Sequence, residues 1–185
     1  MSNVLIGIIG VILFIGLALA GAMFLGPQFQ ASTANSKAAA TTQAASQIAS
    51  AVNLGNVQNG VTFDTTTGTP ALLVTNSWLK SVPANPIVPG NAFSTVNLAA
   101  MVAGTAPAAG QTVDYVMASL GTAGGAVCDA IEKQSGGAST APVYATLAAI
   151  TPAALRTVGC FNTTAAMSGG GATAAAGSYV VYAKI

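Results

Sequence analysis

The 185-residue chain contains no histidine, and charge of either sign is scarce: five Lys and Arg stand against four Asp and Glu, a formal net charge of +1. Without histidine, His-based acid–base catalysis and the usual zinc sites are excluded. The near-zero charge balance gives no basic stripe for a nucleic-acid backbone. We therefore expect no catalytic residue, no metal site, no cofactor and no nucleic-acid partner. The acids are scattered along the sequence at Asp64, Asp114, Asp129 and Glu132.

The scarcity of charge accompanies an excess of apolar residues. Hydrophobic residues make up 52% of the chain and charged residues 5%, whereas about a quarter of an average soluble domain is charged. The first charged side chain is Lys37, and the 22 residues from Val4 to Leu25 are all apolar or glycine. As a helix this run extends over about 33 Å, which is enough to cross a bilayer.

Three interpretations of this apolar segment remain open. A cleaved secretory signal would explain the small residues Ala20-Gly21-Ala22, with a mature chain starting at Met23, but signals place a basic region before an apolar stretch of about 7–15 residues. A plain membrane anchor is the second, although no charge before Lys37 sets its orientation. The third is a mature helix whose basic leader has been removed, and which moves from a membrane into a protein core.

Glycine is frequent in this segment, and each one costs a helix interior about 1 kcal/mol relative to alanine. That cost is offset where small residues let helix backbones approach one another in a nonaqueous setting. Gly16 and Ala20 have the four-residue spacing of such contacts, as do Ala18, Ala22 and Gly26. We predict that the segment packs against like helices through Gly7, Gly10, Gly16, Ala20 and Gly21.

A helix break, in which the helix kinks or locally unwinds, is predicted at Gly26 and Pro27, because proline lacks an amide proton and disfavours helical geometry in the residue before it. An Ala-rich second helical stretch then runs to about Asn53, with an uncharged flexible stalk as the alternative. We expect its polar face to be covered by neighbouring subunits. Small and apolar residues recur at three- and four-residue spacing along one stripe able to lie on a sheet: Ala34, Ala38, Thr41, Ala45, Ile48 and Val52.

A shift in composition to Thr, Asn, Gly and Pro after Leu54-Gly55 marks a domain boundary. It separates a helical region over 1–53, divided into an apolar part (1–26) and an amphipathic part (27–53), from a head over 54–185. Gly124–Gln134 has the length of a short helix. The fold class is α+β, with a long kinked helix packed on an antiparallel sheet. Short β-rich runs bounded by turn residues predict strands at Gly60–Asp64, Ala71–Val74, Thr112–Ala118 and Ser178–Lys184, and the prolines of an irregular connection are Pro83, Pro86 and Pro89.

Cys128 and Cys160 are the only cysteines of the chain. Two thiols without histidine are too few for a metal site, and an export-type N-terminus favours a disulfide. In the chain-entropy model, closing a loop of this length contributes about 3.5 kcal/mol. We predict a bridge that staples the C-terminal third.

The remaining motifs favour structural roles. Asp129 and Lys133 form an i,i+4 pair on the predicted helix, and with Glu132 they indicate a solvated helix face rather than a catalytic carboxylate pair. Trp78 is expected to anchor packing rather than to bind a sugar. Two Gly-rich runs lack the Lys-Ser/Thr ending of a phosphate loop and predict flexible surface loops: Ser135–Ser139 and Ser168–Gly177.

Together these features resemble a type IV pilin, of the type IVb branch in particular. The resemblance is carried by the apolar helix beginning Met1-Ser2-Asn3-Val4-Leu5, the break at Gly26, the helix bearing Cys128, the late Cys160 and the closing strand. It implies a structural subunit of an extracellular filament that polymerises through its N-terminal helix and serves adhesion or motility. It also implies residence in the inner membrane before assembly, leader removal by a prepilin peptidase, methylation of Met1, and a pilus assembly machinery.

One position departs from the pilin pattern. Pilins usually have a glutamate at the fifth mature position, thought to pair with a neighbour's N-terminal amine, and here Leu5 occupies it. No acid lies among the first 36 residues, so helix packing alone must hold the subunits together, or the chain is a minor pilin or a secretion-system pseudopilin. The alternative from another class is a membrane-anchored or secreted binding module, an adhesin whose helix only tethers the head.

Overall fold

The computed structural model describes residues 2–60, 62–106, 108 and 110–185, with residues 2 and 3 described by their backbone alone. Its longest element is helix α1 (Ser2–Asn59). The chain divides into two compact units, one ending at Ala34 and one spanning Asn35–Ile185. The first unit is helix alone, whereas the second, the head, combines the remainder of α1 with every strand.

The local unwinding predicted as one outcome at Gly26 and Pro27 does not occur, because both residues lie inside α1, and the kink predicted as the other outcome stays a prediction. Proline removes only the hydrogen bond that its amide would have donated to the carbonyl of Met23, and the helical bonds on either side remain. The predicted end near Asn53 is also too early, since α1 continues to Asn59. It stops where Gly60 takes a positive φ of 64°, the usual left-handed termination of a helix.

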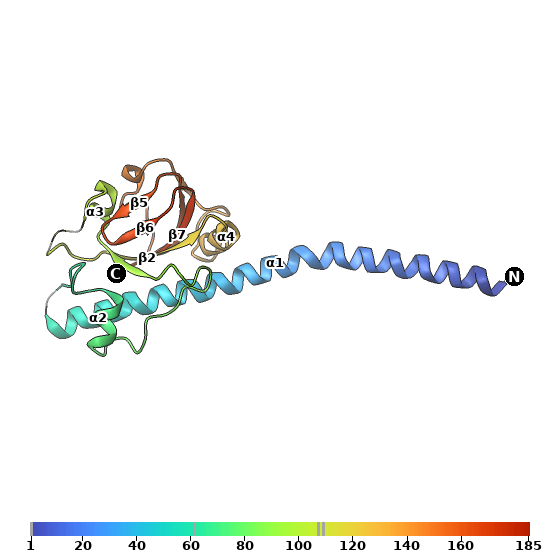
Figure 1. Cartoon of the computed structure of the whole chain (residues 1–185), viewed down its shortest axis with the longest axis horizontal. Coiled ribbons are helices and arrows are strands. Elements are labelled where there is room, and N and C mark those ends of the chain that lie inside the picture. Colours follow the sequence, from blue (N-terminus) through green and yellow to red (C-terminus); the bar gives the residue numbers. More distant parts are fainter. Residues whose placement is uncertain (1, 61, 107, 109) are drawn as a thin grey trace. The chain divides into compact units, whose positions relative to one another are not determined.

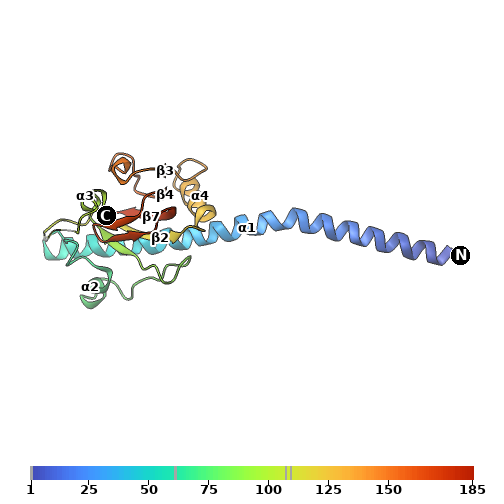
Figure 2. The ribbon, with the colours of Figure 1, turned by 45° about the horizontal axis from the view of Figure 1, so that its top comes forward.

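The predicted stripe on the second half of α1 is confirmed from Ala38 onward, whereas its first residue, Ala34, is only half-buried. Ala38, Thr41, Ala45, Ile48 and Val52 are all fully buried. Small side chains let a helix approach a sheet closely. The one polar side chain among these five, Thr41, donates its hydroxyl to the carbonyl of Lys37, 2.7 Å away, so it is buried with a partner. Figures 1 and 2 show the sheet of the head lying along this part of α1.

The head is built on a five-stranded sheet with the order β1-β2-β7-β4-β3. All pairings are antiparallel except that of β3 with β4, so the expected antiparallel sheet is in fact mixed. The connection through η1 (Leu147–Ala149) returns the chain to the end where β3 began, as a parallel pairing requires. The strands are β1 (Ser94–Val96), β2 (Tyr115–Gly121), β3 (Val143–Tyr144), β4 (Val158–Thr163) and β7 (Ser178–Lys184).

Two of the predicted elements are confirmed closely. β7 has the predicted bounds, and α4 (Gly125–Gln134) matches the predicted short helix within one residue. The strand predicted at Thr112–Ala118 is β2, which begins three residues later than expected, at Tyr115. β7 is central in the sheet, which explains why its alternating apolar residues are buried on both faces.

Two predicted strands are wrong. The run Ala71–Val74 belongs to a helix, α2 (Pro70–Thr75), with proline in its first turn. A four-residue apolar run fits either type of element, and proline at a helix start decides between them here. The described residues of Gly60–Asp64 form no strand: their pairing is limited to a single bridge from Asp64 to Thr112, beside which the Phe63 carbonyl accepts the Val113 amide at 3.1 Å. Val61 lies outside the described residues.

The Gly-rich run Ser168–Gly177 is not a loop throughout, because it contains a hairpin of β5 (Met167–Gly169) and β6 (Ala172–Ala174). Its turn residues Gly170 and Gly171 have φ values of 59° and 94°. The Gly170 carbonyl accepts a hydrogen bond from the Asn97 amide at 3.0 Å. A Cβ at Gly171 would lie 2.6 Å from the Thr95 carbonyl oxygen, so this turn fits against the β1 segment only as glycine.

The hairpin covers one face of the sheet together with η1 and α3 (Leu98–Ala103). Between these elements and the sheet lies a hydrophobic core, separate from the contact of the sheet with α1. Alternate residues of β2, β4 and β7 enter this core, while the intervening residues face the α1 side. Aromatic rings meet within it, with Tyr115 and Tyr182 edge to face at 6.2 Å between ring centres. The head is therefore layered on both faces of its sheet and has a core of its own.

Candidate functional site

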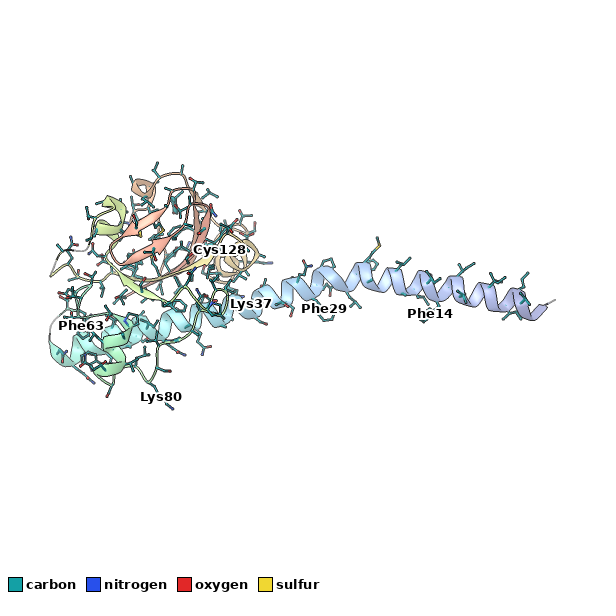
Figure 3. All side chains as sticks on the ribbon, in the orientation of Figure 1. Phe14, Phe29, Lys37, Phe63, Lys80 and Cys128 are labelled. Carbon is teal, nitrogen blue, oxygen red and sulfur yellow. A yellow bond between two sulfur atoms is a disulfide. The ribbon has the colours of Figure 1, made fainter. Side chains whose placement is uncertain are left out.

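The first candidate surface is the apolar segment of α1 from Val4 to Phe29. Every large apolar side chain of this segment is exposed, with Phe14 and Leu17 each 74% accessible. Figure 3 shows Phe14 and Phe29 standing off the helix. The most apolar 18-residue window has a mean hydropathy of 2.8 and is 0% buried, so the helix is long and apolar enough to cross a membrane. This segment requires a nonaqueous surrounding that the chain itself does not provide.

The small residues predicted to mediate helix packing lie in this segment. A Cβ added at Gly7, Gly10, Gly16 or Gly21 would meet nothing within 4 Å, and Ala20 is exposed. Intrachain packing therefore does not explain the glycines. The residues remain candidates for contacts with another helix, where small side chains allow close approach.

The helix start contains the residues implied by the pilin resemblance. Leu5 is 63% exposed, like the apolar side chains that follow it. Met1, the position of the implied methylation, lies outside the described residues. Because Leu5 is apolar, it can contribute to contacts with another helix in a nonaqueous environment by packing and not by an ion pair.

The predicted disulfide is confirmed. Cys128 of α4 and Cys160 of β4 are bonded, with their Cα atoms 5.3 Å apart. Both cysteines are fully buried. One helical turn after Cys128, the buried side chain of Glu132 reaches the same strand, where its Oε1 accepts a hydrogen bond of 2.6 Å from the Cys160 amide. The covalent bridge and this charged hydrogen bond together fix α4 to the sheet.

The structure corrects the solvated helix face predicted for Glu132, since this residue is only 4% exposed. Its carboxylate lies close to Gly159 and Gly137, where a side chain would collide with it. Burial, followed by the nearby negative charge of Glu132, raises the pKa of Tyr182 above its usual value, although its hydroxyl also accepts the Arg156 amide at 3.1 Å. Because the carboxylate is buried and accepts the Cys160 amide, we assign Glu132 to the stability of the head.

A second carboxylate organises the segment after α1. One oxygen of Asp64 accepts four hydrogen bonds of 2.6–2.8 Å from the amides and hydroxyls of Thr66 and Thr67. These bonds hold the pKa of Asp64 well below its usual value. The other oxygen accepts the Gly110 amide at 3.2 Å, and so joins two segments distant in sequence.

An amide that the sequence analysis did not single out organises the proline-containing connection. Asn85 is 1% exposed. Its Nδ2 donates to the carbonyls of Asn91 and Ser119 at 2.9 and 3.0 Å, and its Oδ1 accepts the amides of Ile87 and Val88. The Asn85 side chain thus bonds to β2 at Ser119, which lies past the residues of β2 that pair with β1. Its bond to Ser119 joins residues 34 positions apart, and no local sequence pattern predicts that contact.

The predicted packing role of Trp78 is confirmed. Its ring lies 5.0 Å from that of Phe63, and its Nε1 donates to Gln58 at 2.7 Å. The same two rings occupy the space beside Gly55, where a side chain would collide with them. Trp78 therefore joins the last turns of α1 to the start of the following connection.

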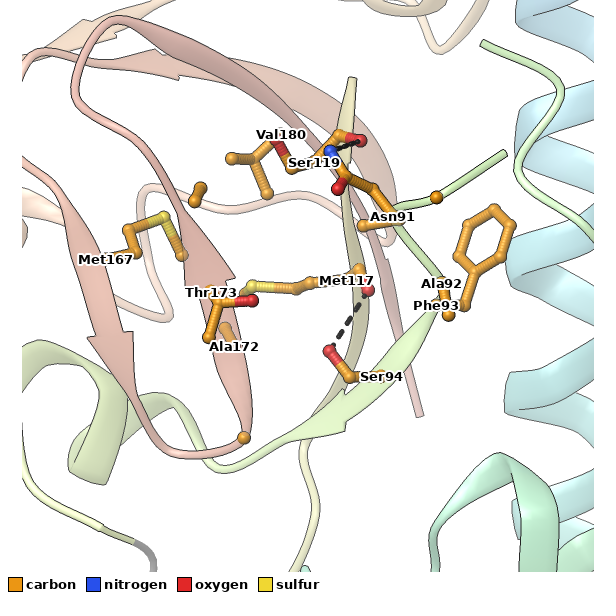
Figure 4. A pocket seen from close by; sticks show the side chains of 14 residues that line it. Asn91, Ala92, Phe93, Ser94, Met117, Ser119, Met167, Ala172, Thr173 and Val180 are labelled. Carbon is orange, nitrogen blue, oxygen red and sulfur yellow. Dashed lines mark hydrogen bonds between the residues drawn. The ribbon is translucent and has the colours of Figure 1, made fainter. Parts of the chain in front are cut away.

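A small cavity of about 220 Å³ lies between the β5–β6 hairpin and the β1–β2 edge (Figure 4). Met117, Met167 and Val180 form its apolar side, while Asn91 and Ser94 supply polar groups. The Ser94 hydroxyl donates to the Met117 carbonyl at 3.4 Å. The side chains that line it carry no charge and include no nucleophile activated by a base, so the cavity offers no arrangement for acid–base chemistry.

Within the described residues, no group of three or more Cys, Asp and Glu side chains is placed to hold a metal ion. Comparisons with protein families, with curated proteins and with solved structures find no match to this chain. The features of the chain that bear on its function are therefore the exposed apolar helix and the head to which it is attached.

Proposed function

We propose that this chain is a structural subunit of an extracellular filament of the type IV pilus kind. The observation that carries the proposal is the helix segment Val4–Phe29, whose large apolar side chains are all exposed while the head has a separate buried core. In this proposal the segment lies in the inner membrane before assembly and among like helices in the filament afterwards. The head faces outward for adhesion or motility.

The physical chemistry of the helix explains why a polymer would persist. Moving from lipid to a bundle of helices exchanges one nonaqueous environment for another, so small-residue packing decides association. Return to water is strongly opposed. At about 25 cal/mol per Å², exposing on the order of 1,500 Å² of such a helix costs tens of kcal/mol. A contact between copies that does not close on itself extends into a helical polymer.

The mechanical role is supported by the way the head is fastened. Its disulfide links α4 to β4, and the buried stripe of α1 lies against the sheet. Force applied through α1 would therefore be transmitted to a cross-linked domain. The proposed subunit performs no chemical reaction and uses no cofactor.

Deletion of residues 1–26 tests the proposal. We expect the truncated protein to be soluble and monomeric in sedimentation while the full chain forms filaments visible by electron microscopy. The control is the disulfide and the circular dichroism spectrum of the truncated head, which should match those of the full chain. Filaments formed by a folded chain without residues 1–26 would contradict the proposal.

Mass spectrometry of the native N-terminus separates the proposal from a cleaved signal. A methylated Met1 is expected for the filament subunit. A native chain that begins at Met23 would have lost most of the apolar helix, and the proposed assembly would then be wrong.

A further inference from the structure

The four acidic side chains of the chain are all engaged by the head's own backbone. Each accepts a hydrogen bond from a backbone amide: Asp64 from Thr66, Asp114 from Leu98, Asp129 from Ala141, and Glu132 from Cys160. Glu132 is buried, and the other three are only partly accessible. The carboxylates therefore serve hydrogen bonding within the head, that of Asp64 at its surface and that of Glu132 in its interior.

The five basic residues have the opposite placement, because every one of them is exposed: Lys37, Lys80, Lys133, Arg156 and Lys184. The formal net charge of +1 thus conceals a difference between backbone-bonded negative and exposed positive charge. A partner that approaches the head encounters cations first, and the backbone-bonded carboxylates only weaken their field.

Two of these cations lie where the chain enters the head. Lys37 is on α1, two residues after Asn35, the first residue of the head unit. The end of α4 lies at the same place, since the Gln134 side chain donates to the Asn35 carbonyl at 3.3 Å. Lys133 immediately precedes Gln134 and is the basic residue in the last turn of α4. Figure 3 shows Lys37 on this part of α1, with Lys80 elsewhere on the head.

We infer that Lys37 and Lys133 bind the anionic headgroups of the membrane that holds the apolar helix. The inference rests on the membrane stage of the proposed function and adds a lipid specificity to it. Lys37 follows the exposed Phe29 by eight residues of α1, or about 12 Å of helix. A headgroup layer several Å thick takes up part of this distance. The remaining distance from Lys37 to the charged surface is comparable to the Debye length, which is about 8 Å at physiological salt.

The arrangement favours a lipid surface over a nucleic acid. The five cations are separate in sequence and come from different segments. A protein that binds a nucleic-acid backbone typically makes about 6–10 phosphate contacts along a continuous stripe. Individual cations near a bilayer respond instead to the diffuse negative potential of anionic lipids, which requires no fixed site.

The full chain in lipid nanodiscs provides the test. One set of discs contains phosphatidylcholine alone and the other contains phosphatidylcholine with phosphatidylglycerol. Lysine acetylation rates are measured residue by residue with mass spectrometry. We expect Lys37 and Lys133 to react about five-fold more slowly in the anionic discs, because each cation gains attraction to the surface. Added NaCl should remove the difference.

Two controls lie in the same chain. Lys80 and Lys184 should react equally in both kinds of disc. Amide hydrogen exchange at the end of α4 should also slow in anionic discs, and Lys37→Gln with Lys133→Gln should abolish that slowing, whereas Lys80→Gln with Lys184→Gln should not.

Equal reactivity of Lys37 and Lys133 in the two lipids would overturn the inference, as would equal slowing at Lys80 and Lys184. Protection of Lys37 and Lys133 by a soluble oligonucleotide in phosphatidylcholine discs, as strong as that given by phosphatidylglycerol, would identify a nucleic acid instead. A chain that forms filaments without the lipid effect contradicts this inference alone. A chain with the lipid effect that never polymerises contradicts the proposed filament alone.

Discussion

The two parts of α1 use the same secondary structure in opposite ways. Up to Phe29 the helix carries large apolar side chains and exposes all of them, whereas within the head it carries small side chains and buries one stripe of them. Helix formation is therefore common to both parts, but only the second part obtains tertiary stability from the chain itself. The difference shows that the apolar part is specified for contacts outside the monomer, and it leads to the following predictions.

The largest effect is expected from the disulfide, which belongs to the head. Replacement of Cys128 and Cys160 by alanine should lower the free energy of unfolding of the head by about 3.5 kcal/mol. Urea unfolding followed by circular dichroism measures the change. A loss below about 1 kcal/mol would mean that the Glu132 hydrogen bond and the sheet hold α4 without the bridge.

A matched pair of substitutions tests the comparison within α1 directly. Ile48 is fully buried and Leu17 is 74% exposed. Ile48→Ala should destabilise the head by about 3 kcal/mol, since it leaves a cavity. Leu17→Ala should change head stability by less than about 0.5 kcal/mol, as expected of an exposed position, with both measured by urea unfolding in detergent. Equal effects would show that the two parts of α1 are not energetically distinct.

A smaller effect is expected for Asn85, which acts by hydrogen bonding rather than by packing. Asn85→Ala should cost about 2 kcal/mol, because the buried Ser119 carbonyl loses the shorter of its two side-chain donors and keeps only Asn91 Nδ2 at 3.4 Å. Thermal unfolding compared with that of Asn76→Ala, an exposed asparagine, measures the difference. If both variants unfold at the temperature of the unsubstituted protein, water replaces the Asn85 amide without cost.

The smallest effect is a pH dependence carried by Asp64. Its folded-state pKa lies below the ordinary value of 3.8, so its contribution to stability is complete above that value and is lost as the pH falls through the folded pKa. Asp64→Asn retains an acceptor oxygen but no charge. The stability difference between the two proteins should therefore shrink from pH 5 to pH 2 in urea unfolding. A difference that stays constant over this range would exclude the charge of Asp64 as its cause.

The elements that the sequence predicted well are those with an unambiguous period. The stripe from Ala38 to Val52 has helical spacing over several turns, and β7 alternates along its length. The helix α2 could not be distinguished from a strand, because a continuous apolar run of only four residues, Ala71–Val74, fits both patterns. The hairpin at Gly170 was missed because its stability depends on contacts with β1, which is distant in sequence.

The candidate surfaces also differ in how far the sequence predicted them. The apolar helix was evident from composition, because 22 consecutive uncharged apolar and glycine residues have few other roles. The outward placement of Lys37 and Lys133 was not, since a net charge records the sum of charges and not their exposure. Only the hydrogen bonds of residues such as Asp129 and Glu132 show which charges are engaged by the head's own backbone.

The tight turn at Gly170 and Gly171 affects how closely packed copies of the chain can associate. An uncovered sheet margin can recruit the margin of a second molecule and grow into an insoluble ribbon. Here the hairpin occupies the margin beside Thr95 and Asn97, with the Asn97 amide already bonded. Many copies held at high density would thereby be discouraged from joining sheet to sheet along this margin, which leaves their helices free to determine how they stack.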